Sequence, residues 1–463
     1  MTGSESLAPK AVSAPGKVLL AGGYLVLDRN YTGLVFGLDA RIHVYIEPIE
    51  TKSGVSLSEI IVKSPQFREA NWEYGYRLTE GDGGIAVTPL RASHDVLLHK
   101  NPFIETALTY ALTYISSHLP HHQIGPSTIS ILASPAYYSN QGTPSNPPSQ
   151  FLKYDVSLSE AHKTGLGSSA ALVTSFTAAL LTYYLPRDVF DIDTEDGLRV
   201  LHNLAQASHC AAQGKVGSGF DIASAVYGSC LYRRFTPTLL SSLPVPGASS
   251  FSTALKNLIE GKEWDTEIHK AAIKMPQGLR LVMCDVDCGS ETPGMVKKVL
   301  QWRAENQEEA DDIWNGLQKG NDDMAKELTR LATQDPQSGE GERYARLRDI
   351  INGNRELIRK MGEASGVPIE PPQQTALLDA CSKIPGIVGG VVPGAGGYDA
   401  VVLLIEDRED VMAELKKLTS AWKVENQGDG ITMGKVGILG IREDMVGARR
   451  EEPAVYQMWN TGS

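Results

Sequence analysis

The sequence predicts a mixed α/β protein that is divided into two lobes. Apolar patterns typical of strands and of helices alternate along the chain. The length of 463 residues suits two or three domains or one large two-lobed unit. A stretch rich in proline, serine and glycine at 241–250 marks the expected division. We therefore expect an N-terminal lobe over residues 1–240 and a C-terminal lobe over residues 241–463.

The first elements expected are strands followed by a helix. The opening fifty residues contain apolar runs on either side of a glycine pair, and 41–50 alternates apolar and polar residues as a half-buried strand does. The clearest early helix spans 101–119. Asn101 can cap this helix and Pro102 suits its first turn, and the apolar residues that follow recur at helical spacing.

Two glycine loops open helices in the middle of the chain. Residues 163–171 read KTGLGSSAA and precede an apolar run, so a helix should begin at or just after Ser168. A helix over 195–213 should stop at Gly214. The second glycine loop, 217–221, reads GSGFD and leads into a short helix.

The second half starts with an expected strand over 279–287. Thr292 and Pro293 provide a cap and a first-turn proline for the next helix, and charged amphipathic helices continue to about Gly362. Two further strands should then be joined by the glycine-rich turn at 393–397.

Charge and composition exclude several classes of protein. The net charge is −12, and lysine and arginine form no run that would bind nucleic acid. We find no signal peptide and no apolar stretch long enough to span a membrane. Five cysteines in a chain of this length indicate a reduced, cytoplasmic protein rather than a disulfide scaffold. Monomer and dimer both remain open.

The 163–171 segment carries the strongest chemical signal. Backbone N–H groups at a helix start are unpaired and favour an anion, and glycines let that backbone approach a phosphate closely. The hydroxyls of Ser168 and Ser169 can bind a phosphate oxygen or a magnesium ion. The alternative is a capped helix after a tight turn. The chain contains no GxxxxGK[ST] pattern, so it is not a P-loop protein.

Three other segments are weaker when each is taken alone. Lys17 follows a Pro-Gly turn and could stabilise charge on a transferring phosphoryl group, or it could be a solvated lysine. Asp221 could accept or orient a substrate hydroxyl proton, or it could only cap a helix. The 393–397 loop could approach a ligand closely, or it could be a long hairpin loop.

Together these segments resemble the GHMP kinase family. The family's three motifs are similar, in the same order, to 14–24 (APGKVLLAGGY), to GLGSSAA at 165–171 and to the glycine loop at 393–397. The resemblance covers most of the chain. It implies a two-lobed α/β fold with the active site between the lobes, ATP as co-substrate and Mg²⁺ as the metal.

The resemblance also implies roles for individual residues. Asp221 and Lys17 match the catalytic positions, and Ser168 or Ser169 would hold magnesium. The nucleotide would contact Gly165, Leu166, Gly167, Ser168, Ser169, Ala170 and Asn101. The small-molecule substrate would contact Lys17, Tyr24, Lys163, Ser218, Gly394, Ala395 and Gly396. His209, on the helix before the GSGFD loop, is interpreted as a packed or surface residue.

Within the family, the details favour the fungal and plant branch that phosphorylates (R)-5-phosphomevalonate to (R)-5-diphosphomevalonate on the route to isoprenoids and sterols. Gly23-Tyr24 stands where other members carry a Gly-Glu-His pattern. Lys163 adds a positive charge that suits a substrate with a phosphate, which is our reason to place it at the substrate. The alternatives are phosphorylation of mevalonate and a ligand sensor without catalysis; a decarboxylase of the same superfamily fits less well.

Overall fold

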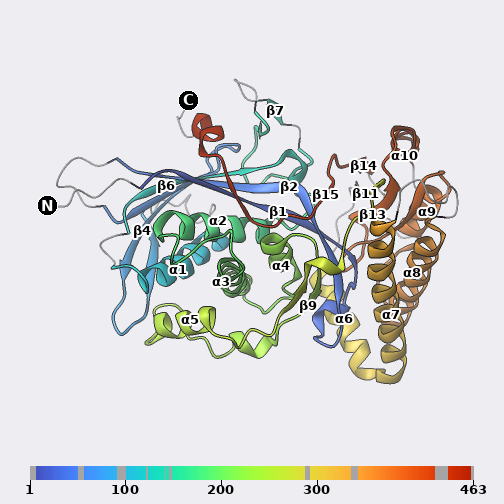
Figure 1. Ribbon diagram of the computed structural model, residues 1–463, viewed down its shortest axis with the longest axis horizontal. Coiled ribbons are helices and arrows are strands. Elements are labelled where there is room, and N and C mark those ends of the chain that lie inside the picture. The colour runs from blue at the N-terminus through green and yellow to red at the C-terminus, as the bar shows by residue number, and fades with distance from the viewer. Residues whose placement is uncertain are drawn as a thin grey trace.

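Two α/β lobes lie side by side in the computed structural model, with the larger N-terminal lobe on the left of Figure 1. The structure describes residues 7–50, 57–90, 101–120, 124–140, 142–144, 149–286, 292–334, 343–422 and 436–459. The expected α/β class and two-lobed arrangement are confirmed. Cys288, the His121-His122 pair and residues 423–435 lie outside the described residues.

A ten-stranded sheet forms one layer of the first lobe. Its long strand β2 (Gly33–Pro48) is buried along most of its length, and it pairs antiparallel with β1 (Lys10–Ala21). Across the sheet the order of neighbouring strands is β10 (Glu267–His269), β9 (Cys230–Arg233), β2, β6 (Ser127–Ala133), β3 (Glu59–Lys63), β4 (Asn71–Leu78) and β5 (Ile85–Pro89). A separate short hairpin joins β7 (Thr143–Pro144) to β8 (Leu152–Lys153).

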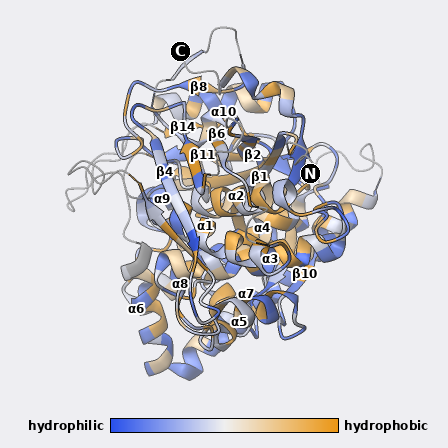
Figure 2. Ribbon diagram, turned by 90° about the vertical axis from the view of Figure 1, so that its left-hand side faces the viewer, coloured by the Kyte–Doolittle hydropathy of each residue, from blue (hydrophilic) through white to orange (hydrophobic). Residues whose placement is uncertain are grey.

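Helices cover one face of this sheet and form its other layer, below the strands in Figure 1. α2 lies against β1 and β2, and its side chains are buried along almost the whole helix. Figure 2 shows the apolar character of this central region around α2 and β1. The layer consists of α1 (Pro102–Ser116), α2 (Ser168–Tyr184), α3 (Glu195–Gln213), α4 (Phe220–Tyr227) and α5 (Phe251–Glu260).

Local capping determines where these helices begin and end. The Asn101 side chain accepts a hydrogen bond from the backbone N–H of Ile104 at 3.3 Å, so the expected cap of α1 is confirmed. α2 begins at Ser168 as expected. α3 ends at Gly214, which takes the left-handed conformation that helix C-termini favour.

The second lobe is a four-stranded antiparallel sheet with helices packed around it. The strand order is β12 (Ile387–Val391), β13 (Ala400–Glu406), β11 (Leu279–Val286) and β14 (Val436–Ile438). The expected pair of strands around the 393–397 turn is confirmed as β12 and β13. The helices are α6 (Thr292–Glu305), α7 (Gln307–Thr333), α8 (Ala345–Ser365), α9 (Pro372–Cys381) and α10 (Glu409–Ala421).

The chain crosses between the lobes more than once. β10 and α5 lie in the first lobe although they follow residue 240, and β15 (Glu443–Asp444) and β16 (Arg449–Glu451) return to pair with β2 and β1. The buried Arg41 guanidinium binds this returning segment through the carboxylate of Asp444 at 3.0 Å and the carbonyl of Gly447. These strand pairings favour a first lobe that extends past residue 240 and that also includes a segment near the end of the chain.

Two further expectations concern the membrane and the thiols. Among the described helices, none combines the length and the apolar character that crossing a bilayer requires. The cysteines that the structure describes are buried and unpaired, as expected of structural thiols: Cys210, Cys230, Cys284 and Cys381.

Candidate active site

Two cavities flank the 163–171 segment, which we call the phosphate loop. The interlobe cavity, of about 310 Å³, lies between the lobes and is lined by Lys17, Tyr24, Thr164, Gly165, Ser218, Phe220 and the 393–396 turn. The α1 cavity, of about 100 Å³, lies at the start of α1 and is lined by Trp72, Asn101, Phe103, Lys163, Ser168 and Ser169. The phosphate loop therefore contributes to both cavities and connects them.

The phosphate loop is held in place at both ends. The Thr164 hydroxyl donates to the carbonyl of Ala136 at 2.6 Å before the glycines. Gly167 caps α2 with a φ of 77°, a left-handed conformation that glycine adopts without strain. Leu166 and Ala170 bury their side chains in the core, so they can offer a ligand only backbone groups. The unpaired N–H groups of the first turn of α2 make this loop suited to bind an anion.

Lys17 lies directly beside the phosphate loop. The pairing of β1 with β2 shifts register between Pro15 and Lys17, and the Lys17 backbone N–H donates to the carbonyl of Leu166 at 2.9 Å. The Lys17 Nζ lies 3.3 Å from the carbonyl oxygen of Gly165. Burial lowers the pKa of the Lys17 ammonium, and the negative charge of Asp221 partly opposes this shift.

Asp221 lies in the first turn of α4, on the other side of Lys17. Its Oδ1 accepts from the backbone N–H of Ile222 at 3.0 Å, while the residue that caps α4 is Gly219. Helix capping therefore does not account for this carboxylate. Its side chain is 24% exposed, and its Oδ2 lies 4.0 Å from Nδ1 of His209. The structure brings together Lys17 and Asp221, two residues that are 204 positions apart in the sequence (221 − 17).

His209 is a neighbour of this site that the sequence did not reveal. Its side chain is 2% exposed, and its Nε2 lies 3.2 Å from Oγ of Ser169 and 3.3 Å from Nε2 of Gln213. The sequence interpretation as a packed residue is correct about burial and misses these polar contacts. One feature of the sequence could have indicated that His209 lies near the site: it is on the last turns of α3, just before the loop that contains Asp221.

The opposite wall of the interlobe cavity comes from the second lobe. Tyr24 has a φ of 66°, and its hydroxyl donates to the carbonyl of Ala395 at 2.7 Å. This bond joins the two lobes across the cavity. Ser218 faces the same cavity, and its carbonyl accepts from the Tyr232 hydroxyl at 2.7 Å. The structure thus brings together Lys17, Tyr24, Ser218 and the 394–396 turn around one cavity.

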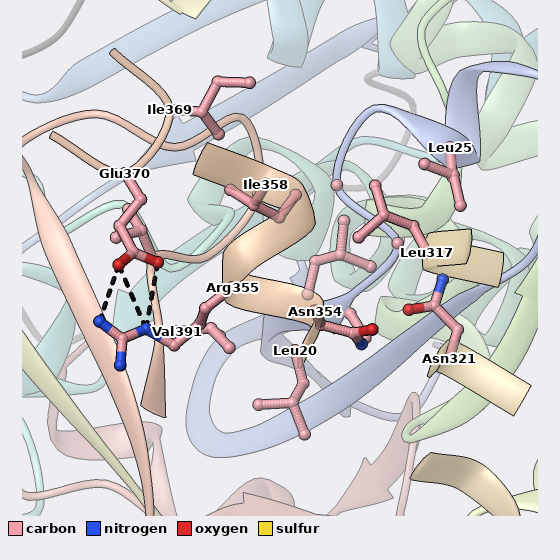
Figure 3. A pocket seen from close by; sticks show the side chains of 16 residues that line it. Leu20, Leu25, Leu317, Asn321, Asn354, Arg355, Ile358, Ile369, Glu370 and Val391 are labelled. Atoms are coloured by element: carbon pink, nitrogen blue, oxygen red, sulfur yellow. Dashed lines mark hydrogen bonds and ion pairs between the residues drawn. The ribbon is translucent and has the colours of Figure 1, made fainter. Parts of the chain in front are cut away.

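The 393–397 turn is supported from behind by a buried ion pair. The Arg355 guanidinium donates to both carboxylate oxygens of Glu370, next to a small cavity of about 40 Å³ (Figure 3). Ile369 precedes Glu370, and its carbonyl accepts from the Gly397 N–H at 3.0 Å. Because a buried ion pair is costly to break, it fixes Ile369 and through it the turn.

Lys163 and Asn101 lie away from the interlobe cavity. Both line the α1 cavity together with Ser168 and Ser169, and Trp72 and Phe103 add aromatic surface to it. Asn101 therefore lies in the same cavity as Ser168 and Ser169 of the phosphate loop. Lys163, which we expected at the substrate, lines the other cavity. Lys163 is close to the glycines in the sequence, but this closeness does not determine which of the two cavities its side chain lines.

The oxygen donors of the site are compatible with magnesium only in the presence of a ligand. In the part of the chain that the structure describes, no three His, Cys, Asp or Glu side chains cluster as a metal site would require. Mg²⁺, however, is commonly held by one or two protein oxygens, water and substrate phosphates. The hydroxyls of Ser168 and Ser169 and the Asp221 carboxylate fit this kind of donor set.

Comparison with known proteins gives consistent matches. The family model described as GHMP kinases N terminal domain matches residues 150–229, and the one described as GHMP kinases C terminal matches residues 338–424. The chain is 51% identical to a phosphomevalonate kinase of Gibberella zeae, over 97% of this chain and 98% of that protein. It is 33% identical to a phosphomevalonate kinase of Arabidopsis thaliana that is named as peroxisomal, over 89% of this chain and 92% of that protein.

A solved structure supports the fold independently. The phosphomevalonate kinase of Streptococcus pneumoniae, solved in complex with phosphomevalonate and AMPPNP, superposes with a TM-score of 0.59 at 16% identity. The match covers 88% of this chain and 95% of that one. At this level of identity the similarity shows a common fold.

Proposed function

This chain belongs to the phosphomevalonate kinases of the GHMP kinase family, and we propose that Lys17 and Asp221 form its catalytic centre beside the phosphate loop. The enzyme transfers the γ-phosphoryl group of ATP to (R)-5-phosphomevalonate and produces (R)-5-diphosphomevalonate and ADP. The main support for the proposed centre is the position of the phosphate loop. The loop lines the interlobe cavity together with Lys17 and Tyr24, and it lines the α1 cavity together with Asn101.

ATP fits the α1 cavity and the phosphate loop. In this arrangement the base lies near Asn101, Trp72 and Phe103, and the phosphates lie along the first turn of α2. Aromatic surface suits stacking against a purine ring, and the N-terminus of a helix suits the phosphates. Lys163 is exposed at the edge of this cavity, so we now propose that it contacts the nucleotide rather than phosphomevalonate.

Phosphomevalonate fits the interlobe cavity. Tyr24, Ser218 and the backbone of the 394–396 turn offer hydrogen bonds, and Lys17 offers a positive charge. The cavity opens toward Gly165, so an acceptor phosphate beside Lys17 faces the γ-phosphate on the phosphate loop. This placement would bring the two reacting groups next to each other, which transfer of the phosphoryl group requires.

The mechanism follows from charge. An oxygen of the acceptor phosphate attacks the γ-phosphorus, and the bond from that phosphorus to the bridging oxygen of ATP breaks, which leaves ADP. A phosphate acceptor is already ionised near neutral pH, so we propose that Asp221 orients the acceptor more than it removes a proton. Lys17 stabilises the charge that is spread over the transferring group, because its ammonium is partly withdrawn from water.

We propose that Ser168 and Ser169 hold Mg²⁺ together with the nucleotide phosphates. The metal supplies positive charge that offsets the repulsion between two polyanions. The protein part of this task is performed by the hydroxyls of the first turn of α2, whose direction is set by the helix.

A panel of variants tests the proposed centre. We expect Asp221→Asn and Lys17→Met each to lower kcat by about 10²–10³-fold with phosphomevalonate as acceptor, while the exposed control Asp188→Asn has no effect. Release of ADP is measured in a coupled assay with phosphomevalonate and with mevalonate. Full activity in both site variants would overturn the assignment. Stronger turnover of mevalonate would favour the first alternative, and ATP binding without turnover would favour the sensor.

We also propose that the enzyme works in the cytoplasm. The support is the set of buried, unpaired thiols, which is typical of a reducing compartment. The plant relative named as peroxisomal makes the peroxisome the alternative to test. A fluorescent fusion imaged together with a peroxisomal marker distinguishes the two locations.

A further inference from the structure

We propose that His209 is a positioning residue that couples Ser169 on the phosphate loop to Asp221. This inference rests on the proposed function, because it assigns to His209 the task of orienting two groups that act on the nucleotide and on the acceptor. Nothing in the three motifs of the family resemblance includes this histidine.

The contacts of His209 place its ring between the two halves of the site. One ring nitrogen, Nε2, lies 3.2 Å from Oγ of Ser169, in the first turn of α2. The other, Nδ1, lies 4.0 Å from Oδ2 of Asp221, in the first turn of α4. Both helices pack against α3. The single ring of His209 therefore faces the starts of two helices that belong to different sequence segments.

The surroundings select one tautomer of the ring. Nε2 of Gln213 lies 3.3 Å from Nε2 of His209, and an amide nitrogen can only donate a hydrogen bond. This contact favours the tautomer in which Nε2 accepts and the ring proton is on Nδ1, the nitrogen that faces the Asp221 carboxylate. Gln213 is four residues after His209 on α3, so the two side chains share one face of the helix.

This tautomer has a consequence for Ser169. A hydroxyl has one proton to donate and two lone pairs to offer. Nε2 has one lone pair, which the Ser169 hydroxyl and the Gln213 amide share. When the Ser169 proton points to Nε2, the lone pairs of the hydroxyl are left for a cation or a phosphate group in the α1 cavity, which Ser169 lines. On the other side, Nδ1 lies 4.0 Å from Oδ2 of Asp221, a distance at which an N–H dipole attracts the carboxylate without a direct hydrogen bond. Groups that orient metal ligands in this way commonly change metal affinity by about 10–100-fold.

The ring itself is held firmly enough for this task. The His209 side chain is 2% exposed, and its ring packs against that of Phe103 with centroids 5.6 Å apart. Phe103 lines the α1 cavity, so the histidine also supports the wall of the site. A purely structural histidine would pack in the same way, and the experiment must separate the two roles.

The chain offers a matched control on the same helix. His202 is also 2% exposed on α3, and its Nδ1 pairs with the Asn203 side chain at 3.2 Å, away from both cavities of the site. We expect His209→Phe and His202→Phe to have similar effects on thermal unfolding. Only His209→Phe should lower kcat and raise the Mg²⁺ concentration for half-maximal rate, each by about tenfold or more, with little change in KM for phosphomevalonate.

Two conservative variants separate the two contacts. His209→Asn keeps a donor near the position of Nδ1 and should recover the part of kcat that depends on Asp221. His209→Gln places an acceptor near the position of Nε2 and should recover the Mg²⁺ dependence. If both variants behave as His209→Phe does, the coupling through two distinct nitrogens is overturned.

Ring ¹⁵N chemical shifts of the full chain give a readout that does not depend on activity. The inference requires a protonated Nδ1 and an unprotonated Nε2 at His209, and a shift change at Nε2 in Ser169→Ala. A proton on Nε2 would overturn it, as would an unchanged Mg²⁺ dependence in His209→Phe. If Asp221→Asn is inactive while His209→Phe is silent, only this inference fails; if Asp221→Asn is fully active, the proposed centre fails.

Discussion

At the scale of single residues, the charge on Lys17 depends on two opposing influences. Withdrawal from water disfavours the ammonium, and the neighbouring Asp221 carboxylate favours it. Burial has the larger effect, so the pKa of Lys17 is below the ordinary value of 10.5. A lysine with this property becomes neutral at a lower pH than a solvated lysine does as the pH rises.

We predict that the alkaline limb of kcat/KM reports this ionisation. The limb should begin below the ordinary pKa of a lysine, because kcat/KM follows ionisations of the free enzyme. In Asp221→Asn the attraction that favours the ammonium is lost, the pKa of Lys17 falls further, and the limb of the residual activity should move to lower pH. Profiles at constant ionic strength check this, with Asp188→Asn as the charge-matched control. A limb that stays in place or moves to higher pH in Asp221→Asn contradicts the prediction.

The residues found from the sequence share a property that those it missed do not have. Ser168 stands in a segment whose own spacing indicates a phosphate-binding turn, and Lys17 and Asp221 stand in short segments that gain weight from the resemblance to the GHMP kinase family. His209 and the orientation of Lys163 depend on which helix lies opposite, and a side chain on a helix carries no local signal of its partner across the core. The sequence could therefore indicate the candidate groups of Lys17, Ser168 and Asp221 but not the histidine that lies between Ser169 and Asp221.

At the scale of elements, the turn between β12 and β13 shows how closely the second lobe is packed. Gly396 has a φ of 83°, and a Cβ on it would lie 2.3 Å from the carbonyl oxygen of Ile369. Gly394, two residues earlier, has a φ of 69° and open space around the same position. Both glycines therefore need a left-handed backbone conformation. Only Gly396 also lacks space for a Cβ.

We predict different losses of stability for alanine at these two positions. Gly394→Ala should cost about 1–2 kcal/mol, because a left-handed conformation is unfavourable for residues with a Cβ. Gly396→Ala has a similar backbone cost and should lose about 1–3 kcal/mol more, because the new Cβ meets a backbone oxygen that the Glu370 ion pair holds in place. Urea titrations of both variants give the difference in the free energy of unfolding. Equal losses would show that the turn moves away from Ile369 at no cost.

The elements that the sequence predicted are those with their own start and stop signals. α1 has an asparagine cap and α3 a terminal glycine, and both bounds are confirmed. The region 236–276 had no clear interpretation, and it contains α5 and the three-residue strand β10. A strand this short is stabilised by its pairing with β9 and has too few residues to show an alternating pattern.

At the scale of the whole molecule, contacts between distant parts of the chain determine the shape of the site. β16 pairs with β1 although their residues are 438 positions apart, as in the pair of Ser13 and Glu451. No local sequence pattern predicts that a segment near the end of the chain pairs with β1. The expected division therefore placed all residues after 240 in the second lobe. The resemblance to a family supplied the two-lobed arrangement, and the geometry of the lobes came only from the structure.

Two tyrosine hydroxyls join the lobes at different places. Tyr24 donates to the carbonyl of Ala395 at 2.7 Å and lines the interlobe cavity. Tyr31 donates to the side chain of Asn315 on α7 at 3.3 Å, and it does not line that cavity. Both rings are buried in one hydrophobic cluster with residues of α6 and α7. The pair therefore separates the effect of joining the lobes from the effect of lining the substrate site.

We predict that Tyr24→Phe and Tyr31→Phe have similar effects on stability and different effects on catalysis. Each variant keeps the buried ring and loses one hydrogen bond, which should cost about 0.5–1.5 kcal/mol in the free energy of unfolding. Only Tyr24→Phe should raise KM for phosphomevalonate, by about three- to tenfold, because the hydroxyl also fixes the turn that faces the substrate. Urea titrations and steady-state kinetics with ATP at saturation measure the two quantities. An equal rise of KM in both variants would mean that the contact between the lobes, rather than the wall of the cavity, determines how tightly phosphomevalonate binds.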